Sequence, residues 1–183
     1  LLDFRYKSYF DGPQKNPKGW QKLVNLIHEQ VKELMTNYGK IDILWYDGAW
    51  QHEKWGYQPS QEGIAKAWQS KKLNAMVRRL QPDILINNRS YPYSEGDFGT
   101  PEQKITPEHR PWELCDTMGD LWGDAPQDLN RKSVREIITR LITCVSLGGN
   151  MLLNIGPKAD GSVRPWQGRI MERIGTWMKK TEN

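Results

Sequence analysis

Helical and strand-like hydrophobic patterns alternate along this chain, and their order limits the folds that the chain can adopt. Four segments carry apolar residues at three- and four-residue steps, which predicts amphipathic helices over residues 20–38, 60–80, 133–145 and 166–179. Three short apolar runs are typical of buried strands, at residues 41–48, 84–86 and 151–156. Helix followed by strand, repeated, predicts parallel βα units and an α/β fold.

Composition excludes several classes of function. The chain has 183 residues with 37% hydrophobic and 26% charged residues, which is typical of a globular domain. The net charge of +4 comes without a long run of Lys or Arg, so no nucleic-acid partner is expected. No apolar run approaches the roughly 20 residues of a membrane-spanning helix, so no membrane is expected either. Cys115 and Cys144 allow at most one disulfide and show no metal-ligand spacing, which favours two small core residues.

Residues 87–130 form a long polar stretch with little regular pattern. Such a segment is either a linker or a set of active-site loops. The stretch is rich in aromatic and charged residues, and linkers usually carry fewer rings. The whole chain has nine Trp and seven Tyr, which suits either a sugar-binding site or an ordinary core. We expect these residues to form binding loops.

Asp47 is the first candidate for chemistry. It ends the apolar run that starts at Ile41, and Gly48 follows it. In barrels and open α/β sheets, the working residues lie at the carboxyl ends of such strands. The alternative is that Asp47 and Gly48 form only a turn dipeptide.

Five sequence blocks in order resemble the motifs of the α-L-fucosidases of glycoside hydrolase family 29. The blocks are Leu44-Trp45-Tyr46-Asp47-Gly48; Ile86-Asn87-Asn88-Arg89; Thr100-Pro101-Glu102; Trp112-Glu113 with Thr117-Met118-Gly119 and Trp122-Gly123; and Leu152-Leu153-Asn154-Ile155-Gly156-Pro157 with Asp160-Gly161. Residues 1–6 resemble the segment that follows the third barrel strand in that family.

The resemblance implies a fold and an activity. The fold would be a partial (β/α)8-like, TIM-type barrel over residues 1–183, with roughly strands 4 to 8 and their helices. Residues 1–183 would then lack the first strands and the C-terminal β-sandwich of the family. The activity implied for the intact parent is that of a retaining exo-α-L-fucosidase, which hydrolyses terminal α-L-fucosyl linkages by double displacement.

The resemblance also implies roles for individual residues. Asp47 matches the nucleophile that attacks the anomeric carbon of fucose. Glu102 is the preferred acid/base, and Glu113 is its rival and a possible sugar contact. Arg89 matches an arginine that binds sugar hydroxyls near the nucleophile. Trp45, two residues before Asp47 and so on the same strand face, matches a ring that borders the pocket.

The remaining implications concern the ligand and the compartment. Fucose carries a methyl group, and Trp122 is a candidate for the apolar surface that receives it. The expected partner is a fucosylated oligosaccharide or glycoconjugate. No metal or organic cofactor is expected, because two carboxylates suffice for this reaction. The resemblance to the family suggests a secreted, periplasmic or lysosomal protein, and the oligomeric state stays open.

Plainer explanations remain open for these residues. Arg89 would be a surface arginine, Glu102 would cap a helix behind Pro101, and Trp45 would belong to the barrel core. His28 is expected on the polar face of its helix. His52 follows Asp47 closely enough to border the site.

The chain departs from the family in one important respect. Family members hold fucose with histidines and aromatic residues from the first three barrel strands, and this chain does not supply them. The remaining strands and helices would expose much apolar surface. The 183-residue chain alone is therefore expected to show little or no fucosidase activity.

An alternative function is a non-catalytic protein that binds fucose or another carbohydrate on the same fold. The presence of both Asp47 and Glu102 favours the enzyme, since a binding module has no need of an ionised carboxylate beneath the anomeric carbon.

Overall fold

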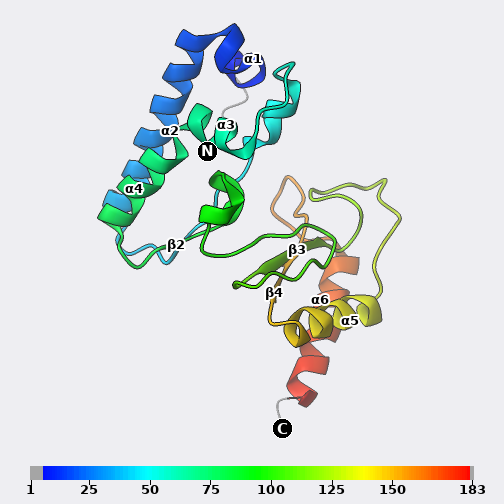
Figure 1. Ribbon diagram of the computed structural model, residues 1–183. Helices are drawn as coiled ribbons and strands as arrows, with labels where there is room; N and C mark the ends of the chain where they lie inside the picture. Colours follow the sequence, from blue (N-terminus) through cyan, green and yellow to red (C-terminus); the bar gives the residue numbers. More distant parts are fainter. Residues whose placement is uncertain (1–5, 182–183) are drawn as a thin grey trace. The chain divides into compact units, whose positions relative to one another are not determined.

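The computed structural model describes residues 6–181 and shows a mixed α/β fold (Figure 1). The chain forms two compact units, residues 1–99 and 100–183. Residues 1–5, which carry most of the resemblance to the segment after a third barrel strand, lie outside the described residues.

The first unit contains helices around one short parallel strand pair. Its elements are α1 (Lys7–Lys15), α2 (Pro17–Asn37), β1 (Ile43–Leu44), η1 (Ala49–Lys54), α3 (Gln61–Trp68), α4 (Ser70–Leu80), β2 (Leu85–Ile86), η2 (Asn88–Ser90) and η3 (Tyr93–Glu95). Strands β1 and β2 pair in parallel, with Ile43 opposite Leu85 and Leu44 opposite Ile86. The predicted parallel βα arrangement is confirmed here, although each strand is only two residues long.

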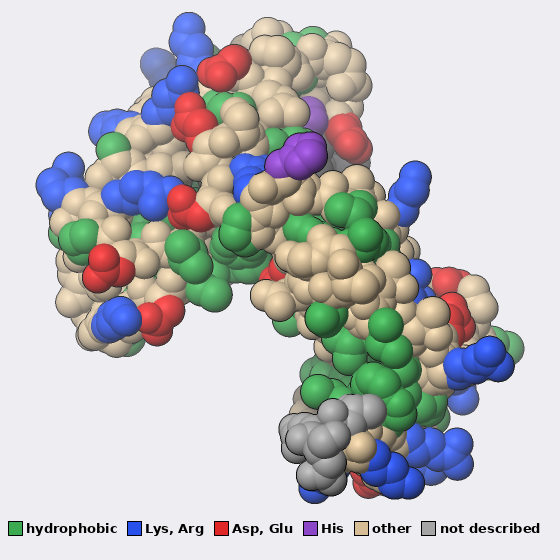
Figure 2. All heavy atoms as spheres, turned by 60° about the horizontal axis from the view of Figure 1, so that its bottom comes forward, with side chains coloured by type: hydrophobic (Ala, Val, Ile, Leu, Met, Phe, Trp, Pro, Cys, Tyr) green, Lys and Arg blue, Asp and Glu red, His purple; other side chains and the backbone are tan. Residues whose placement is uncertain are grey.

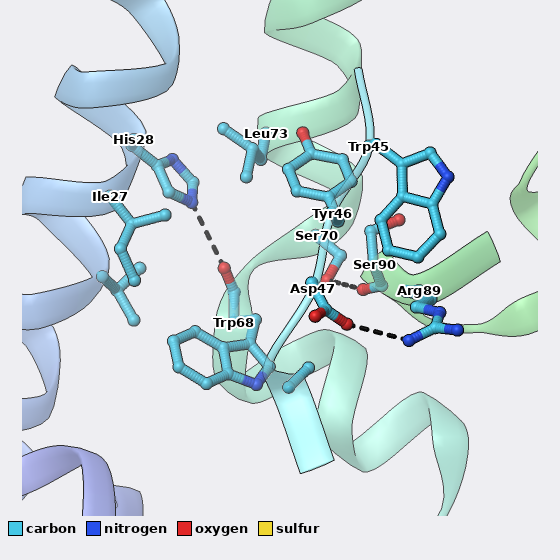
Figure 3. Close-up of a pocket in the computed structure, with 12 residues that line it drawn as sticks. Ile27, His28, Trp45, Tyr46, Asp47, Trp68, Ser70, Leu73, Arg89 and Ser90 are labelled. Atoms are coloured by element: carbon cyan, nitrogen blue, oxygen red, sulfur yellow. Dashed lines mark hydrogen bonds and ion pairs between the residues drawn. The ribbon is translucent and has the colours of Figure 1, made fainter. Parts of the chain in front are cut away.

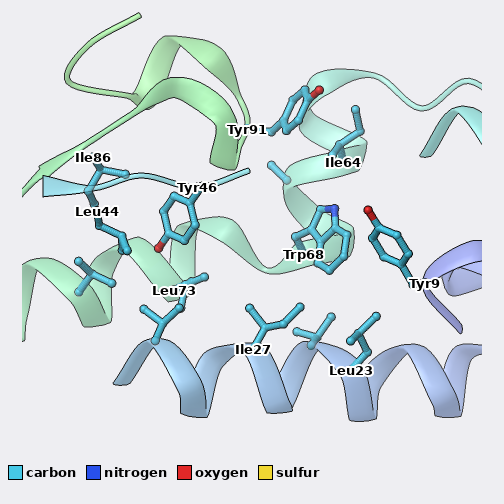
Figure 4. Packing of buried hydrophobic residues seen from close by; sticks show 14 of the residues in the cluster. Tyr9, Leu23, Ile27, Leu44, Tyr46, Ile64, Trp68, Leu73, Ile86 and Tyr91 are labelled. Atoms are coloured by element: carbon cyan, nitrogen blue, oxygen red, sulfur yellow. The ribbon is translucent and has the colours of Figure 1, made fainter. Parts of the chain in front are cut away.

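Helix α2 contributes one side of the hydrophobic core in this unit. It begins three residues earlier than predicted, because Asn16 accepts a hydrogen bond from the Gly19 N–H at 3.0 Å and Pro17 suits the first turn. Its apolar stripe packs against β1, β2, α3 and α4 (Figure 4). The fully buried members of the stripe are Leu23, Val24 and Val31. This packing fixes the layer on which β1 rests.

The helix predicted over residues 60–80 is wrong in one respect, since it breaks into α3 and α4 at Gln69. Gln69 adopts a left-handed conformation, with φ 55°. The last carbonyls of α3 have tertiary partners: Trp20 Nε1 donates to the Ala67 carbonyl at 2.9 Å, and His28 Nε2 donates to the Trp68 carbonyl at 3.2 Å. Because side chains of α2 satisfy these carbonyls, the helix ends there without leaving them unpaired.

The second unit is a βαβ arrangement with one further helix. Its elements are β3 (Glu113–Thr117), α5 (Val134–Ser146), β4 (Asn150–Asn154) and α6 (Pro165–Thr181). Strands β3 and β4 pair in parallel over five residues, from Glu113 opposite Asn150 to Thr117 opposite Asn154. The Glu136 N–H donates to Ser133 Oγ at 3.1 Å, which confirms the N-cap bond of the predicted capping box.

Strand β3 corrects the interpretation of residues 87–130 as irregular. Its burial is nearly complete although its sequence contains Glu113 and Asp116. Asp116 is fully buried, and its charge is compensated by Arg140 and Lys132. Both cations come later in the chain, so the local pattern does not predict a buried strand here.

Apolar side chains remain exposed in both units. In the first unit, the paired residues Ile43 and Leu85 are 52% and 48% exposed. In the second, hydrophobic side chains gather beside the end of α6 (Figure 2), and Met178 is 46% exposed. Cys115 and Cys144 are buried and free, which confirms their prediction as core residues.

The described residues contain no closed barrel, since their strands form two separate parallel pairs. Among residues 6–181, no helix is long and apolar enough to cross a membrane.

Candidate active site

Asp47 lies directly after β1, where the chain turns. Gly48 has φ 92°, a left-handed conformation that favours glycine. The Tyr9 hydroxyl donates to the Gly48 carbonyl at 2.6 Å, which ties this turn to α1. Burial, and then the nearby Asp47 charge, raises the pKa of Tyr9 to about 12. The phenol therefore stays protonated and keeps this hydrogen bond at neutral pH.

Asn87 fixes the backbone immediately before Asp47. Its side chain accepts from the Tyr46 N–H and donates to the Tyr46 carbonyl, both at 2.9 Å. Asn87 is fully buried, so neither bond competes with water. The Asn87 side-chain amide therefore continues the hydrogen bonding of β1 and β2 by one residue, up to Tyr46. The sequence shows Asn87 only as part of a motif, and its structural role depends on a partner 41 residues away.

Arg89 joins Asp47 and Trp45 in one group (Figure 3). Its Nη1 donates to Asp47 Oδ1 at 2.9 Å, and its guanidinium carbon lies 4.5 Å from the centre of the Trp45 ring. The Arg89 side chain is 17% exposed, which argues against a plain surface arginine, whereas that of Asp47 is 51% exposed. The structure thus brings together the predicted nucleophile, sugar-binding arginine and bordering ring.

The segment that carries Arg89 is anchored to α4. Ser70 Oγ donates to the Ser90 carbonyl, and Asn74 Nδ2 donates to Ser90 Oγ at 3.1 Å. Ser70, Asn74 and Ser90 are all buried. These bonds hold the short η2 turn against the helix, so the Arg89 backbone is fixed independently of its ion pair.

A cavity of about 130 Å³ opens beside Asp47. Its lining is mostly apolar and comes from α2, α3, α4 and the segments that follow β1 and β2: Val24, Ile27, His28, Trp45, Tyr46, Asp47, Ala49, Trp68, Ser70, Leu73, Arg89 and Ser90. Mostly apolar walls with a few charged groups are typical of small-molecule sites.

His28 is part of this lining, which corrects its prediction as a polar-face residue. Its ring is hydrogen-bonded to the carbonyl of Trp68, the last residue of α3 (Figure 3). Burial lowers the pKa of His28, and the hydrogen bond to Trp68 opposes that shift in part. His52 is not among the lining residues, and its ring packs edge-on against Tyr91 at 5.8 Å.

The candidate acid/base residues lie in the second unit. Pro101 and Gln103 pair with β3: the Cys115 N–H donates to the Pro101 carbonyl at 2.9 Å, and the Gln103 N–H donates to the Cys115 carbonyl at 2.8 Å. Glu102 therefore stands opposite Cys115, and paired residues project from the same face. Glu113 is two residues from Cys115 and shares that face.

Glu113 on β3 and Glu102, which pairs with β3, thus lie on the same face of this sheet. No helix begins behind Pro101 in the described part of the chain, so the capping alternative for Glu102 is wrong. Trp122 is 39% exposed, and its carbonyl accepts from Asn154 Nδ2 at 2.6 Å, which ties its loop to the end of β4.

A family comparison decides the classification of this chain. The family model described as alpha-L-fucosidase matches residues 1–183. The chain belongs to the α-L-fucosidase family. Among curated relatives, human tissue α-L-fucosidase is 30% identical over 164 residues, which are 81% of this chain and 32% of that protein. The chain thus spans about a third of the length of the curated fucosidases that it matches.

Solved α-L-fucosidases share the fold. A family 29 enzyme from Bacteroides thetaiotaomicron, solved as a trapped covalent intermediate with 2-fluoro-fucosyl fluoride, matches with TM-score 0.75 and 25% identity. The match covers 93% of this chain and 42% of that enzyme. The α-L-fucosidase AlfC D200A, solved with Fuca(1,6)GlcNAc, matches with TM-score 0.65 and 26% identity over 90% of this chain and 49% of that enzyme.

Proposed function

We propose that this chain is the central and later part of the catalytic domain of a retaining exo-α-L-fucosidase. In this proposal residues 1–183 contribute roughly strands 4 to 8 of a (β/α)8-like barrel, and further strands complete the sugar pocket. Asp47 is the nucleophile and Glu102 the acid/base, with Glu113 as its rival. Trp45, Arg89, Glu113 and Trp122 bind the sugar.

One observation carries this proposal. In a chain matched over its full length by the fucosidase family, a partly exposed carboxylate follows a parallel strand and is held by an arginine that stacks on a tryptophan. A binding protein would have little use for such a directed carboxylate, whereas a retaining glycosidase requires one beneath the anomeric carbon.

In this proposal each of these residues takes part in a defined step. Arg89 holds Asp47 Oδ1, and we assign attack on the anomeric carbon to Oδ2. As that bond forms, the bond to the leaving oxygen breaks, and Glu102 gives this oxygen its proton. Water then attacks the glycosyl-enzyme while Glu102 takes its proton back, which releases fucose and restores Asp47. This scheme needs carboxyl groups about 5 to 5.5 Å apart.

The substrate and setting follow the relatives. AlfC is described with Fuca(1,6)GlcNAc, and the Bacteroides enzyme with a fluorinated fucosyl fluoride. We propose a terminal α-L-fucosyl group on an oligosaccharide or glycoconjugate as substrate. A secreted, periplasmic or lysosomal location suits such substrates.

Replacement of the nucleophile tests the proposal. In the complete catalytic domain, Asp47→Gly should lower kcat for an aryl fucoside on the order of 10³-fold or more. Azide should restore turnover by attacking from the side that the carboxylate vacates, and the product should be β-L-fucosyl azide. The matched control is Asp42→Asn, because Asp42 is exposed and pairs only with the exposed Lys40 in the described contacts. Full activity of Asp47→Gly without azide would refute the assignment, and inactivity of the unsubstituted domain together with fucose binding would favour the non-catalytic alternative.

A further inference from the structure

Asp116 is a fully buried carboxylate in the second unit that the proposed mechanism does not use. It lies on β3 between Cys115 and Thr117, so it projects from the face opposite to that of Glu113. Arg140 of α5 donates from Nε to Asp116 Oδ2, and Lys132 Nζ lies 3.4 Å from Oδ1. The carboxylate therefore has two cations on two different segments.

The two cations hold different parts of the unit. Lys132 Nζ also donates to the carbonyls of Thr117 and Gly119, at 2.7 and 3.1 Å, and so fixes the turn after β3. Arg140 uses its other arm differently, since Nη2 donates to the carbonyl of Gln103. Lys132 can therefore compensate the Asp116 charge alongside Arg140. Of these two cations, Arg140 is the one that also contacts the Gln103 carbonyl.

That further contact lies next to the candidate acid/base. Gln103 follows Glu102 directly and has φ 56°, a left-handed conformation that an L side chain adopts only under constraint. One backbone bond to Cys115 and the Arg140 guanidinium hold it. The planar guanidinium can contact a carboxylate and a carbonyl at the same time, which a lysine ammonium on a flexible stem does poorly.

We propose that Arg140, oriented by Asp116, is a positioning residue for the acid/base Glu102 and acts through the backbone of Gln103. The inference rests on the proposed function. It adds to that function a role for α5, which packs on the opposite face of β3: through Arg140, this helix fixes the position of the Glu102 carboxyl that transfers the proton.

The test uses two substrates that differ in their need for that proton. In the complete domain, Arg140→Lys keeps a positive charge beside Asp116 but removes the guanidinium that contacts Asp116 and the Gln103 carbonyl together. For a fucosyl disaccharide, kcat/KM should fall by about 10- to 100-fold, because a displacement of about 1 Å can cost that much. For fucosyl fluoride, whose leaving group needs little protonation, kcat/KM should change by less than about threefold.

Two controls separate positioning from a loss of structure. Arg135→Lys changes an exposed arginine of the same helix and should leave both substrates unaffected. A double-mutant cycle then asks whether Arg140 acts through Glu102. In a Glu102→Ala background, Arg140→Lys should change disaccharide kcat/KM by less than about twofold, whereas in a Glu113→Ala background its full effect should persist.

Equal losses on both substrates would overturn the inference, since they would indicate a general structural role. Additive losses with Glu102→Ala would overturn it as well, and so would a coupling that appears with Glu113 instead. Failure of the unsubstituted domain to hydrolyse either substrate would overturn the proposed function itself, whereas normal turnover with additive losses would overturn only the role of Arg140.

Discussion

At the scale of single residues, the candidate nucleophile depends on Asn87. Two 2.9 Å hydrogen bonds from one buried amide to the Tyr46 backbone continue the strand pairing to the residue before Asp47. An amide is suited to this place because it offers one donor and one acceptor. A carboxylate of the same shape would present only acceptors to the Tyr46 carbonyl.

Asn87→Asp should therefore destabilise the fold by about 3 kcal/mol, because it leaves a buried carbonyl unpaired beside a buried charge. The measurement is denaturant unfolding at pH 7. Asn25→Asp serves as the control, since Asn25 is exposed and its Oδ1 only accepts from Gln21, so its change should stay within about 0.5 kcal/mol. Equal midpoints for the two variants would show that the Asn87 bonds do not fix the strand end.

His28 should give the fold a distinct dependence on pH. Burial lowers the pKa of His28 below the ordinary histidine value of about 6.5, so the unfolded chain binds a proton more readily than the folded one. Stability therefore rises with pH through this window and is lost as the pH falls below about 6.5. His28→Gln should lose less stability than the unsubstituted protein between pH 7 and 5. The exposed His109, changed to Gln, is the control, and identical pH profiles for all three proteins would contradict this role.

Three of the predicted site residues, Trp45, Asp47 and Arg89, lie together in the structure. Asp47 and Trp45 share a face by the two-residue period of a strand, and Arg89 follows strand β2, which pairs in parallel with β1. The roles of Asn87 and His28 were missed because their partners, Tyr46 and the Trp68 carbonyl, lie about 40 residues away in the sequence. The convergence of Asp47 with Glu102 stays a prediction.

At the scale of elements, the break between α3 and α4 is the main surprise. The hydrophobic period continues across Gln69, so sequence alone predicts one helix over residues 60–80. The break depends on Trp20 and His28 of α2, which bind the last carbonyls of α3. Tertiary hydrogen bonds here override a continuous local pattern.

A comparison of two substitutions at position 69 tests this break. Both Gln69→Gly and Gln69→Ala remove the side-chain bond to Gln21, so their difference reports the backbone. Because φ is 55°, the glycine variant should be more stable than the alanine variant by about 1 kcal/mol. Thermal or denaturant unfolding measures this difference. A more stable alanine variant would indicate a continuous helix.

Strand β3 could not be predicted for a related reason. The helices around it have caps and apolar stripes that are visible in the sequence, and α5 and α6 were predicted to within two residues. The buried charge of Asp116 breaks the strand pattern, and its compensation by Arg140 and Lys132 becomes evident only after folding.

At the scale of the whole molecule, each unit exposes surface that an α/β barrel normally buries. The paired residues Ile43 and Leu85 are both about half exposed on one face of β1–β2, and Leu152 of β4 is 47% exposed. Strands of parallel barrels are usually covered on both faces. The described strands are therefore expected to need further elements of the domain.

The 183-residue chain alone should show little or no turnover of a nitrophenyl fucoside, whereas a longer chain that completes the barrel should hydrolyse it. The comparison uses equal molar concentrations of the two purified proteins. The Asp47→Gly form of the longer chain provides the background rate. Turnover by the short chain equal to that of the long chain would show that the pocket needs no further strands.

The central claim is that Asp47 forms a covalent bond to fucose during turnover. The complete domain should be inactivated by 2-fluoro-fucosyl fluoride, and mass spectrometry of the digested protein should find one fluorofucosyl group on the peptide that contains Asp47. A label on another carboxylate, or steady turnover of fucosides with no labelled peptide, would contradict the account.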